Sequence, residues 1–500
     1  MLDKRGCGIL LHPTSLPGPG GIGTLGEDAR RFVDLLSDMG MSYWQVLPLS
    51  PPACGNSPYS AFTAFGGNPL LINLERIAAE GDLGAVPGIG RYSESHVDYS
   101  AVSGPKIEQL YQAASNFLAA KNTSRTLEYR HFCDTTPWLN DYALFMALKR
   151  RYHGKSWNLW PDEASYIAKA AHQEYSGKFG LEVAVQKYLQ WQFSRQWHEL
   201  RVYANDRGIA IIGDIPIFVA YDSADVWSHR DLFLLDSSGK PKFVAGVPPD
   251  YFSSSGQLWG NPHYNWSVME QNGYRWWVDR FKQVFALFDL VRVDHFRGFE
   301  AAWHIPAKDK TAERGSWIKS PGERLFDALL AELGELPIIA EDLGVITPEV
   351  LALRDRYNFP GMKILQFAFE SEPVSLPHNH VKNGVVYTGT HDNDTTKGWY
   401  NSISAAERHE MSKYLGCSGG DGVGNLIRAA LMSVANTVVM PFQDILKLGS
   451  EARMNIPGTP FGNWEWRFSW DMLPRELAAS LRKQLERYDR VEHGEKKYAP

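Results

Sequence analysis

Eight short apolar runs, most of them separated by segments of helical periodicity, limit the folds open to this chain. The runs span residues 6–12, 43–49, 209–219, 290–296, 337–343, 362–368, 385–390 and 437–442. Strands that alternate with helices imply parallel crossovers, and eight such strands predict an α/β fold of the (β/α)8, or TIM, barrel type. An open doubly wound sheet is the alternative, but no Gly-rich phosphate loop follows the first run.

Two long segments interrupt this alternation. Residues 52–205 are mostly of helical pattern and end in an amphipathic stretch over 181–205. Residues 220–285 include GVPPDYFSSSGQLWGNPHYNW (246–266), which is dense in Gly, Pro, Ser and aromatic residues. We expect a single catalytic barrel over 1–500, with largely helical subdomains inserted at about 52–205, after the second strand, and at about 220–285, after the third.

Charge and cysteine content exclude several classes of protein. The formal net charge of −6 over 500 residues favours neither nucleic acid nor an anionic membrane as a partner. No stretch approaches the roughly 20 apolar residues of a membrane span, and the first residues lack a signal-peptide layout. Four cysteines lie far apart without metal or disulfide spacing: Cys7, Cys54, Cys133 and Cys417. We therefore expect a reducing, cytoplasmic location.

Charged residues stand at or just after the carboxyl ends of four of the expected strands. In a barrel these ends meet at one mouth, where polar residues are typical of catalysis. The set comprises Asp214, Arg292, Asp294, Glu341, Asp342, His391 and Asp392. Capping and structural salt bridges would not require acids at the same end of so many strands.

The stretch LVRVDHFRG (290–298) is the most informative of these strand ends. Residues i and i+2 of a strand point the same way, so Arg292 and Asp294 share a face. A carboxylate beside a guanidinium stays ionised because the opposite charge lowers its pKa. Taken alone, the pair fits either a nucleophilic aspartate or a strand-end salt bridge.

The set of acids at the mouth suits the cleavage of a glycosidic bond. That reaction needs one carboxylate that attacks the anomeric carbon and one carboxylic acid that protonates the leaving oxygen. Arg292 marks Asp294 as the ionised partner, whereas Glu341 follows the apolar residues 338–340, and desolvation raises a carboxyl pKa. Asp392, with His391, could hold sugar hydroxyls. Carboxylates also bind Mg²⁺ or Ca²⁺, but Arg292 would repel a divalent cation.

Aromatic and polar residues gather in loop-like sequence, as expected for a sugar groove. Sugars present hydroxyl groups at their edges and C–H groups on their faces, so their sites combine hydrogen-bonding groups with aromatic rings. Each residue alone is more typical of packing, and only the group favours a glycan groove. Its members are Tyr59, Asp250, Tyr251, Phe252, Trp259, Asn463, Trp464 and Trp466.

Long motifs extend this interpretation to nearly the whole chain. They include LLHPTSLPGPGGIGTLG (10–26), SPYSAFTAFGGNP (57–69), GDIPIFVAYDSADVW (213–227), AGVPPDYFS (245–253), VRVDHFRGFE (291–300), AEDLGVITPEV (340–350), YTGTHDNDT (387–395), MNIPGT (454–459) and GNWEWR (462–467). The chain thereby resembles the 4-α-glucanotransferases called amylomaltase or disproportionating enzyme, which belong to the α-amylase superfamily.

The resemblance implies a retaining transfer of a 1,4-α-glucan segment to the 4-hydroxyl of another glucan or of glucose, through a covalent glycosyl-enzyme, with no cofactor and no catalytic metal. The residues that match the family's roles are Asp294 as nucleophile, Glu341 as acid/base, Asp392 as transition-state stabiliser, Arg292 and His391 at the cleaved unit, Asp214 as the third-strand acid, and Asp250, Tyr251 and Phe252 in a mobile loop at 246–259.

Two departures and two alternatives accompany this hypothesis. General α-amylases carry a histidine where this chain has Val219, which agrees with the transferases, and Cys54 puts a secondary glucan site in doubt because some relatives have an aromatic residue there. A hydrolase would use the same acids and differ only in whether water or a sugar reaches the intermediate first. A non-catalytic glycan-binding barrel is the other alternative, but it would be expected to lack one of the three acids.

Overall fold

The computed structural model describes most of the chain. It covers residues 2–53, 55–84, 86, 92–120, 123–165, 169–249, 254–369, 373–417 and 420–491. The predicted contacts Asp250, Tyr251 and Phe252, and the departure at Cys54, lie outside the described residues.

Eight parallel strands close into a barrel in the order β1-β12-β11-β10-β9-β6-β3-β2. Each strand corresponds to one of the eight predicted apolar runs, so the (β/α)8 prediction is confirmed. The strands are β1 (Gly6–Leu10), β2 (Tyr43–Gln45), β3 (Ala210–Pro216), β6 (Leu290–Asp294), β9 (Ile338–Ala340), β10 (Gly361–Ile364), β11 (Gly384–Tyr387) and β12 (Thr437–Pro441).

Several strands are shorter than the predicted apolar runs, because their pairing stops before the carboxyl end of the run. The run 43–49 pairs only over β2 (Tyr43–Gln45), and the run 337–343 pairs only over β9 (Ile338–Ala340). Beyond these points the chain leaves the sheet while still buried. Glu341, the first residue after β9, therefore lies at the barrel mouth and not within the wall.

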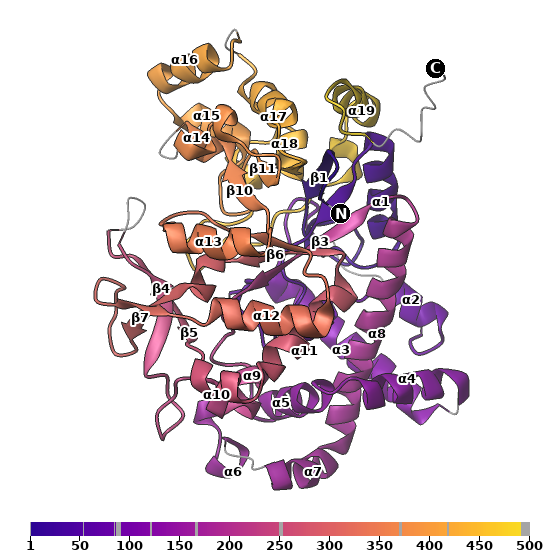
Figure 1. The fold of residues 1–500 in the computed structure, drawn as a ribbon. Coiled ribbons are helices and arrows are strands. Elements are labelled where there is room, and N and C mark those ends of the chain that lie inside the picture. The colour runs from indigo at the N-terminus through magenta and orange to yellow at the C-terminus, as the bar shows by residue number, and fades with distance from the viewer. Residues whose placement is uncertain are drawn as a thin grey trace.

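Helices surround the barrel and form most of the segment between β2 and β3. In Figure 1, α5, α6 and α7 gather at the bottom of the view, away from the strands. No helix in the described ranges is long and apolar enough to cross a membrane. The helices of this segment are α2 (Leu74–Ala79), α3 (Tyr99–Ala119), α4 (Thr123–Thr135), α5 (Leu139–Arg151), α6 (Asp162–Ser165), α7 (Lys169–Lys178) and α8 (Gly180–Asn205).

The remaining helices accompany the barrel strands along the chain. The list is α1 (Glu27–Met39), α9 (Ala224–Ser228), α10 (Trp266–Gln271), α11 (Arg275–Leu287), α12 (Gly322–Leu333), α13 (Pro348–Arg356), α14 (Leu365–Ala368), α15 (Thr396–Ser402), α16 (Ala405–Tyr414), α17 (Gly422–Met432), α18 (Phe442–Ile445) and α19 (Leu477–Arg487).

Helix α8 fastens the first inserted segment to the barrel. The Trp197 indole N–H donates to the carbonyl of Leu287 at 2.8 Å, and its ring meets Phe288 edge-on with centroids 5.9 Å apart. The Phe288 ring fills the space above Gly213, where a Cβ atom would lie 2.2 Å from it. Glycine at this position lets the aromatic layer pack directly against β3, one residue before Asp214.

A second sheet, which the sequence did not predict, lies beside the barrel and takes two of its strands from the segment after β3. Its order is β5-β4-β7-β8, all antiparallel. Strands β4 (Phe243–Val247) and β5 (Gln257–Pro262) belong to the segment after β3, whereas β7 (Ala301–Pro306) and β8 (Ser316–Lys319) follow β6. Figure 1 shows β4, β5 and β7 together beside the barrel. That the whole chain acts as one catalytic unit stays a prediction.

The C-terminal segment closes the amino end of the barrel through Arg490. This arginine is fully buried, and its guanidinium donates five hydrogen bonds of 2.9–3.1 Å to main-chain carbonyls. One acceptor is Gly6 at the start of β1, and the others lie over residues 431–436, which lead into β12. Arg490 thus holds together the strand pair that closes the barrel.

We expect Arg490→Met to lower the stability of the fold by about 3 kcal/mol or more. The substitution leaves buried carbonyls without their charged donor, and bonds to charged groups contribute about 1.5–3 kcal/mol each before relaxation. The measurement is the thermal midpoint, with Arg487→Met on the exposed part of α19 as the matched control. Equal midpoints for the two variants would contradict a role for Arg490 in closing the barrel.

Candidate active site

Arg292 is the centre of the barrel mouth. One guanidinium nitrogen, Nη1, donates to Oδ2 of Asp214 at 2.6 Å, and Nη2 donates to Oδ1 of Asp294 at 2.8 Å. The register of the sheet places Asp214 on β3 directly opposite Arg292 on β6. The strand-end salt bridge expected for Arg292 and Asp294 is therefore present, and the same guanidinium also binds a second carboxylate.

Tyr59 extends this network towards the neighbouring strand ends. Its hydroxyl donates to Oδ2 of Asp214 at 2.8 Å, and its ring stacks on His391 with centroids 5.0 Å apart and planes inclined by 14°. The Asp214 side chain is fully buried. Burial raises the pKa of Asp214 to about 7, although the contacts with Arg292 and Tyr59 act in the opposite direction and favour its ionised form.

Glu341 lies in a different environment from the other carboxylates. Its oxygens accept hydrogen bonds from two main-chain N–H groups, those of His295 at 2.7 Å and Leu343 at 2.9 Å. Burial, followed by the negative charge of Asp294, raises the pKa of Glu341 well above its ordinary value of 4.5, and this outweighs the lowering effect of Arg292 and of the N–H donors. The predicted acid is therefore protonated where an ordinary glutamate would be ionised.

The main chain at His295 is shaped to hold Glu341. His295 has φ = 54° in the left-handed region, which a non-glycine residue rarely adopts. This conformation turns its N–H towards the Glu341 carboxylate, and the next N–H, of Phe296, donates to the Glu341 carbonyl at 3.2 Å. Rare backbone conformations of this kind are concentrated at functional sites.

Asp342 does not join the other acids. Its side chain is buried, forms an ion pair with Arg354 on α13, and accepts the main-chain N–H of Met362 on β10 at 2.7 Å. Adjacent residues of an extended segment point to opposite sides, so Asp342 faces the surrounding helices while Glu341 faces the mouth. These contacts of Asp342 stabilise the end of β9 against α13 and β10.

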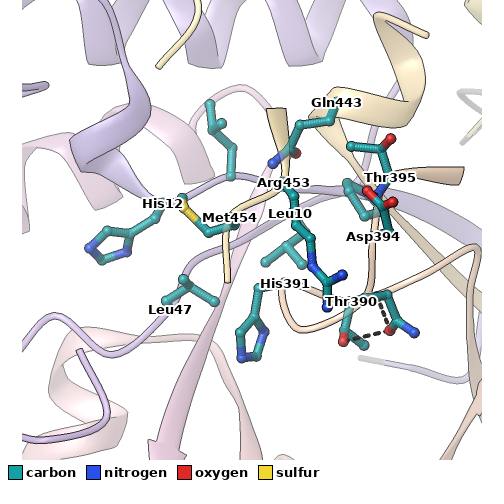
Figure 2. Close-up of a pocket in the computed structure, with 13 residues that line it drawn as sticks. Leu10, His12, Leu47, Thr390, His391, Asp394, Thr395, Gln443, Arg453 and Met454 are labelled. Carbon is teal, nitrogen blue, oxygen red and sulfur yellow. Dashed lines mark hydrogen bonds between the residues drawn. The ribbon is translucent and has the colours of Figure 1, made fainter. Parts of the chain in front are cut away.

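His391 and Asp392 follow β11 and lie side by side. His391 is buried, and burial lowers the pKa of its imidazole. Its Nε2 atom lies 3.4 Å from Oδ1 of Asp392, whose side chain is 48% exposed. Figure 2 shows Arg453 extending its guanidinium towards this segment, where Nη2 donates to the main-chain carbonyl of Asp392 at 2.7 Å.

The predicted aromatic and amide contacts divide into two groups. Trp259 on β5 is 38% exposed and meets the His295 ring edge-on with centroids 4.8 Å apart, so it reaches the site. Trp464 and Trp466 are both buried, and Trp464 packs near Tyr59 and His391. Asn463 is also buried, and its amide is bonded to Ile456 and Thr459 of its own loop. The predicted substrate contact of Asn463 thus has no support from this geometry.

Three site residues escaped the sequence prediction. His12, at the end of β1, lines the pocket in Figure 2 together with His391 and Arg453, and burial lowers its pKa to about 3. Asn455 and Arg453 bind Asp392 from a distant loop. Asn455 carries no charge and Arg453 stands outside any strand end, so neither was predicted as a site residue, although Asn455 belongs to the motif at 454–459.

Metal-ligating side chains do not cluster in the described structure. Over its described ranges, no group of three or more His, Cys, Asp or Glu residues is placed to hold a metal ion.

Fold and site together define a (β/α)8-barrel enzyme with carboxylates gathered at the carboxyl ends of its strands. A family model described as 4-alpha-glucanotransferase matches residues 11–473. The chain therefore belongs to the 4-alpha-glucanotransferase family, and it is an enzyme of that type.

Individual relatives agree with this assignment over their whole length. The 4-alpha-glucanotransferase of Synechocystis sp. is 48% identical over 499 residues, which cover 98% of this chain and 99% of the relative. The 4-alpha-glucanotransferase of Thermus thermophilus is also 48% identical, over 97% and 99% of the two chains. The structure of amylomaltase from Streptococcus agalactiae in complex with acarbose superposes with a TM-score of 0.94 at 36% identity, covering 98% of this chain and 100% of that one.

We expect Tyr59→Phe to destabilise the protein by about 1.5–3 kcal/mol, because it removes a hydroxyl that donates to a fully buried carboxylate. Tyr203→Phe is the matched control, since Tyr203 donates to Asp34, whose side chain is 48% exposed, and we expect a loss of less than about 1 kcal/mol there. Denaturant unfolding of the two variants measures the difference. Equal losses would show that burial of Asp214 does not matter.

Proposed function

We propose that this 4-α-glucanotransferase works by double displacement through a covalent glycosyl-enzyme on Asp294. The observation that carries the proposal is the contrast between two carboxyl groups at one mouth. Asp294 is paired with a guanidinium, whereas Glu341 is held by main-chain N–H groups with a raised pKa. Such a contrast suits one carboxylate nucleophile and one carboxylic acid.

In the first step an Asp294 oxygen attacks the anomeric carbon of an α-1,4-linked glucose unit. Arg292 binds Oδ1, and within the described part of the chain Oδ2 accepts no hydrogen bond, which leaves Oδ2 as the attacking atom. Glu341 gives its proton to the glycosidic oxygen as the bond to the anomeric carbon breaks, so the leaving glucan departs with a neutral 4-hydroxyl.

In the second step the ionised Glu341 accepts the proton of an acceptor 4-hydroxyl. The acceptor oxygen attacks the anomeric carbon and releases Asp294, so two inversions give net retention. The acceptor is another α-1,4-glucan or glucose. Transfer exceeds hydrolysis if a sugar reaches the intermediate before water, and the predicted loop at 246–259 is the proposed cover.

We assign the remaining polar residues to the cleaved sugar unit. Asp392 faces the developing positive charge of the transition state, and His391, neutral because burial lowers its pKa, is a hydrogen-bonding partner for a hydroxyl. Trp259 and Tyr59 offer aromatic surface for sugar faces. The cytoplasmic location stays a prediction from the sequence.

The test of the function uses maltotriose with no added metal or cofactor. We expect a ladder of longer oligosaccharides and glucose while total reducing ends stay nearly constant, because each cleaved bond is remade. With a 5-fluoro glycosyl fluoride donor we expect a mass increase on the peptide that contains Asp294, and Asp294→Asn should abolish both labelling and transfer. Rising reducing ends with only shorter products would establish hydrolysis, and an unlabelled peptide would contradict the covalent step.

The raised pKa of Glu341 predicts the pH dependence of transfer. Glu341 must be protonated in the first step, so kcat/KM falls as pH rises through its raised pKa, and the enzyme keeps its activity well above pH 4.5. An activated fluoride donor needs no proton from Glu341, so with this donor the fall should weaken. The measurement is the rate profile for both donors in wild type. An alkaline limb identical for the two donors would exclude Glu341 as the proton donor.

A further inference from the structure

Residues 453–464 form a closed loop next to Asp392. The Trp464 N–H donates to the Met454 carbonyl at 2.7 Å and joins the two ends of the loop. Inside it, Asn463 accepts the N–H of Ile456 at 2.9 Å and donates to the carbonyl and hydroxyl of Thr459 at 2.9 and 3.0 Å. The buried Asn463 amide therefore fixes the shape of the loop from within.

Two residues at the start of this loop bind Asp392. The Asn455 amide Nδ2 donates to Oδ1 of Asp392 at 2.6 Å. Arg453 donates through Nη2 to the Asp392 carbonyl and through Nε to the Asn455 carbonyl, both at 2.7 Å. Arg453 thus ties the main chains of Asp392 and Asn455 together, and Asn455 fixes the carboxylate itself.

Asp392 needs such support because little else holds its side chain. It is 48% exposed and belongs to neither a strand nor a helix. Its main-chain N–H makes only a 3.3 Å bond to the Thr390 hydroxyl, and the neutral His391 ring lies 3.4 Å from Oδ1. An exposed aspartate without a fixed partner would sample several rotamers.

We propose that Asn455 is the positioning residue of Asp392, and that Asn463 acts on the reaction only by shaping the loop that carries Asn455. The inference rests on the proposed role of Asp392 in the transition state. An amide donor orients the carboxylate and leaves its negative charge in place, whereas an arginine or lysine at this position would neutralise it. The side chain of Arg453 also leaves the charge of the Asp392 carboxylate in place, because it binds main-chain carbonyls and not the carboxylate.

The test is a double-mutant cycle between Asn455→Ala and Asp392→Asn, measured with maltotriosyl fluoride as donor so that residual turnover stays measurable. We expect Asn455→Ala alone to lower kcat about 10- to 100-fold, the loss of one charge-assisted hydrogen bond, with KM changed less than about 2-fold. In the Asp392→Asn background the same substitution should change kcat less than about 3-fold.

The matched control is Asn383→Ala. Asn383 precedes β11 at the opposite end from Asp392, and its exposed amide also donates to a neighbouring loop, at Asn358. We expect wild-type kcat from this variant, and thermal midpoints close to wild type for both asparagine variants.

The outcomes separate the proposed role of Asp392 from the proposed positioning role of Asn455. Wild-type kcat in Asp392→Asn would overturn the proposed role of Asp392 itself. A strong effect of Asp392→Asn combined with an additive cycle, or with unchanged kcat in Asn455→Ala, would overturn the positioning role alone. A rise in KM at constant kcat would show that Asn455 serves substrate binding and not the transition state.

Discussion

The candidate active site depends on one buried cation, the Arg292 guanidinium. It binds the buried Asp214 and the partly exposed Asp294 at the same time, at 2.6 and 2.8 Å. A buried charge without a partner costs several kcal/mol, so the arginine and the two aspartates require one another. Burial opposes the ionisation of Asp214 and raises its pKa to about 7, so Arg292 is the group that favours the ionised form of this carboxyl against burial.

The barrel determines which residues can meet at this cation. Parallel pairing sets Asp214 opposite Arg292 and Pro216 opposite Asp294, so β3 and β6 present their polar residues at one level. The early end of β9 then frees Glu341 to accept the N–H of His295, which follows Asp294 directly. The acid and the proposed nucleophile are thus held by the same short segment, although they stand 47 positions apart in numbering, 294 and 341.

The barrel could be predicted because each strand is a short apolar run between helices. The acids of the candidate site could be predicted because they stand at or just after the carboxyl ends of four of these runs. The sheet β5-β4-β7-β8 was missed because its strands contain Gly, Pro and exposed residues and pair across two separate segments of the chain. The sequence also set Asp342 beside Glu341 without showing that they face opposite sides. Asn455 was not predicted as a site residue because it is uncharged and lies 63 positions from Asp392 in the chain. Only the folded structure shows that the two side chains are in contact.

The proposed role of Asp392 explains why the side chain that binds its carboxylate, Asn455, is uncharged. In the proposed mechanism Arg292 can hold Asp294 through a full ion pair, because the nucleophile must stay ionised. The role proposed for Asp392 sets a different requirement, since its charge would act on the sugar and a cation bound to its carboxylate would weaken that field. An amide supplies direction without charge. The two proposed acids are therefore fixed by different means, an arginine for the one that attacks and an asparagine for the one whose charge must remain available.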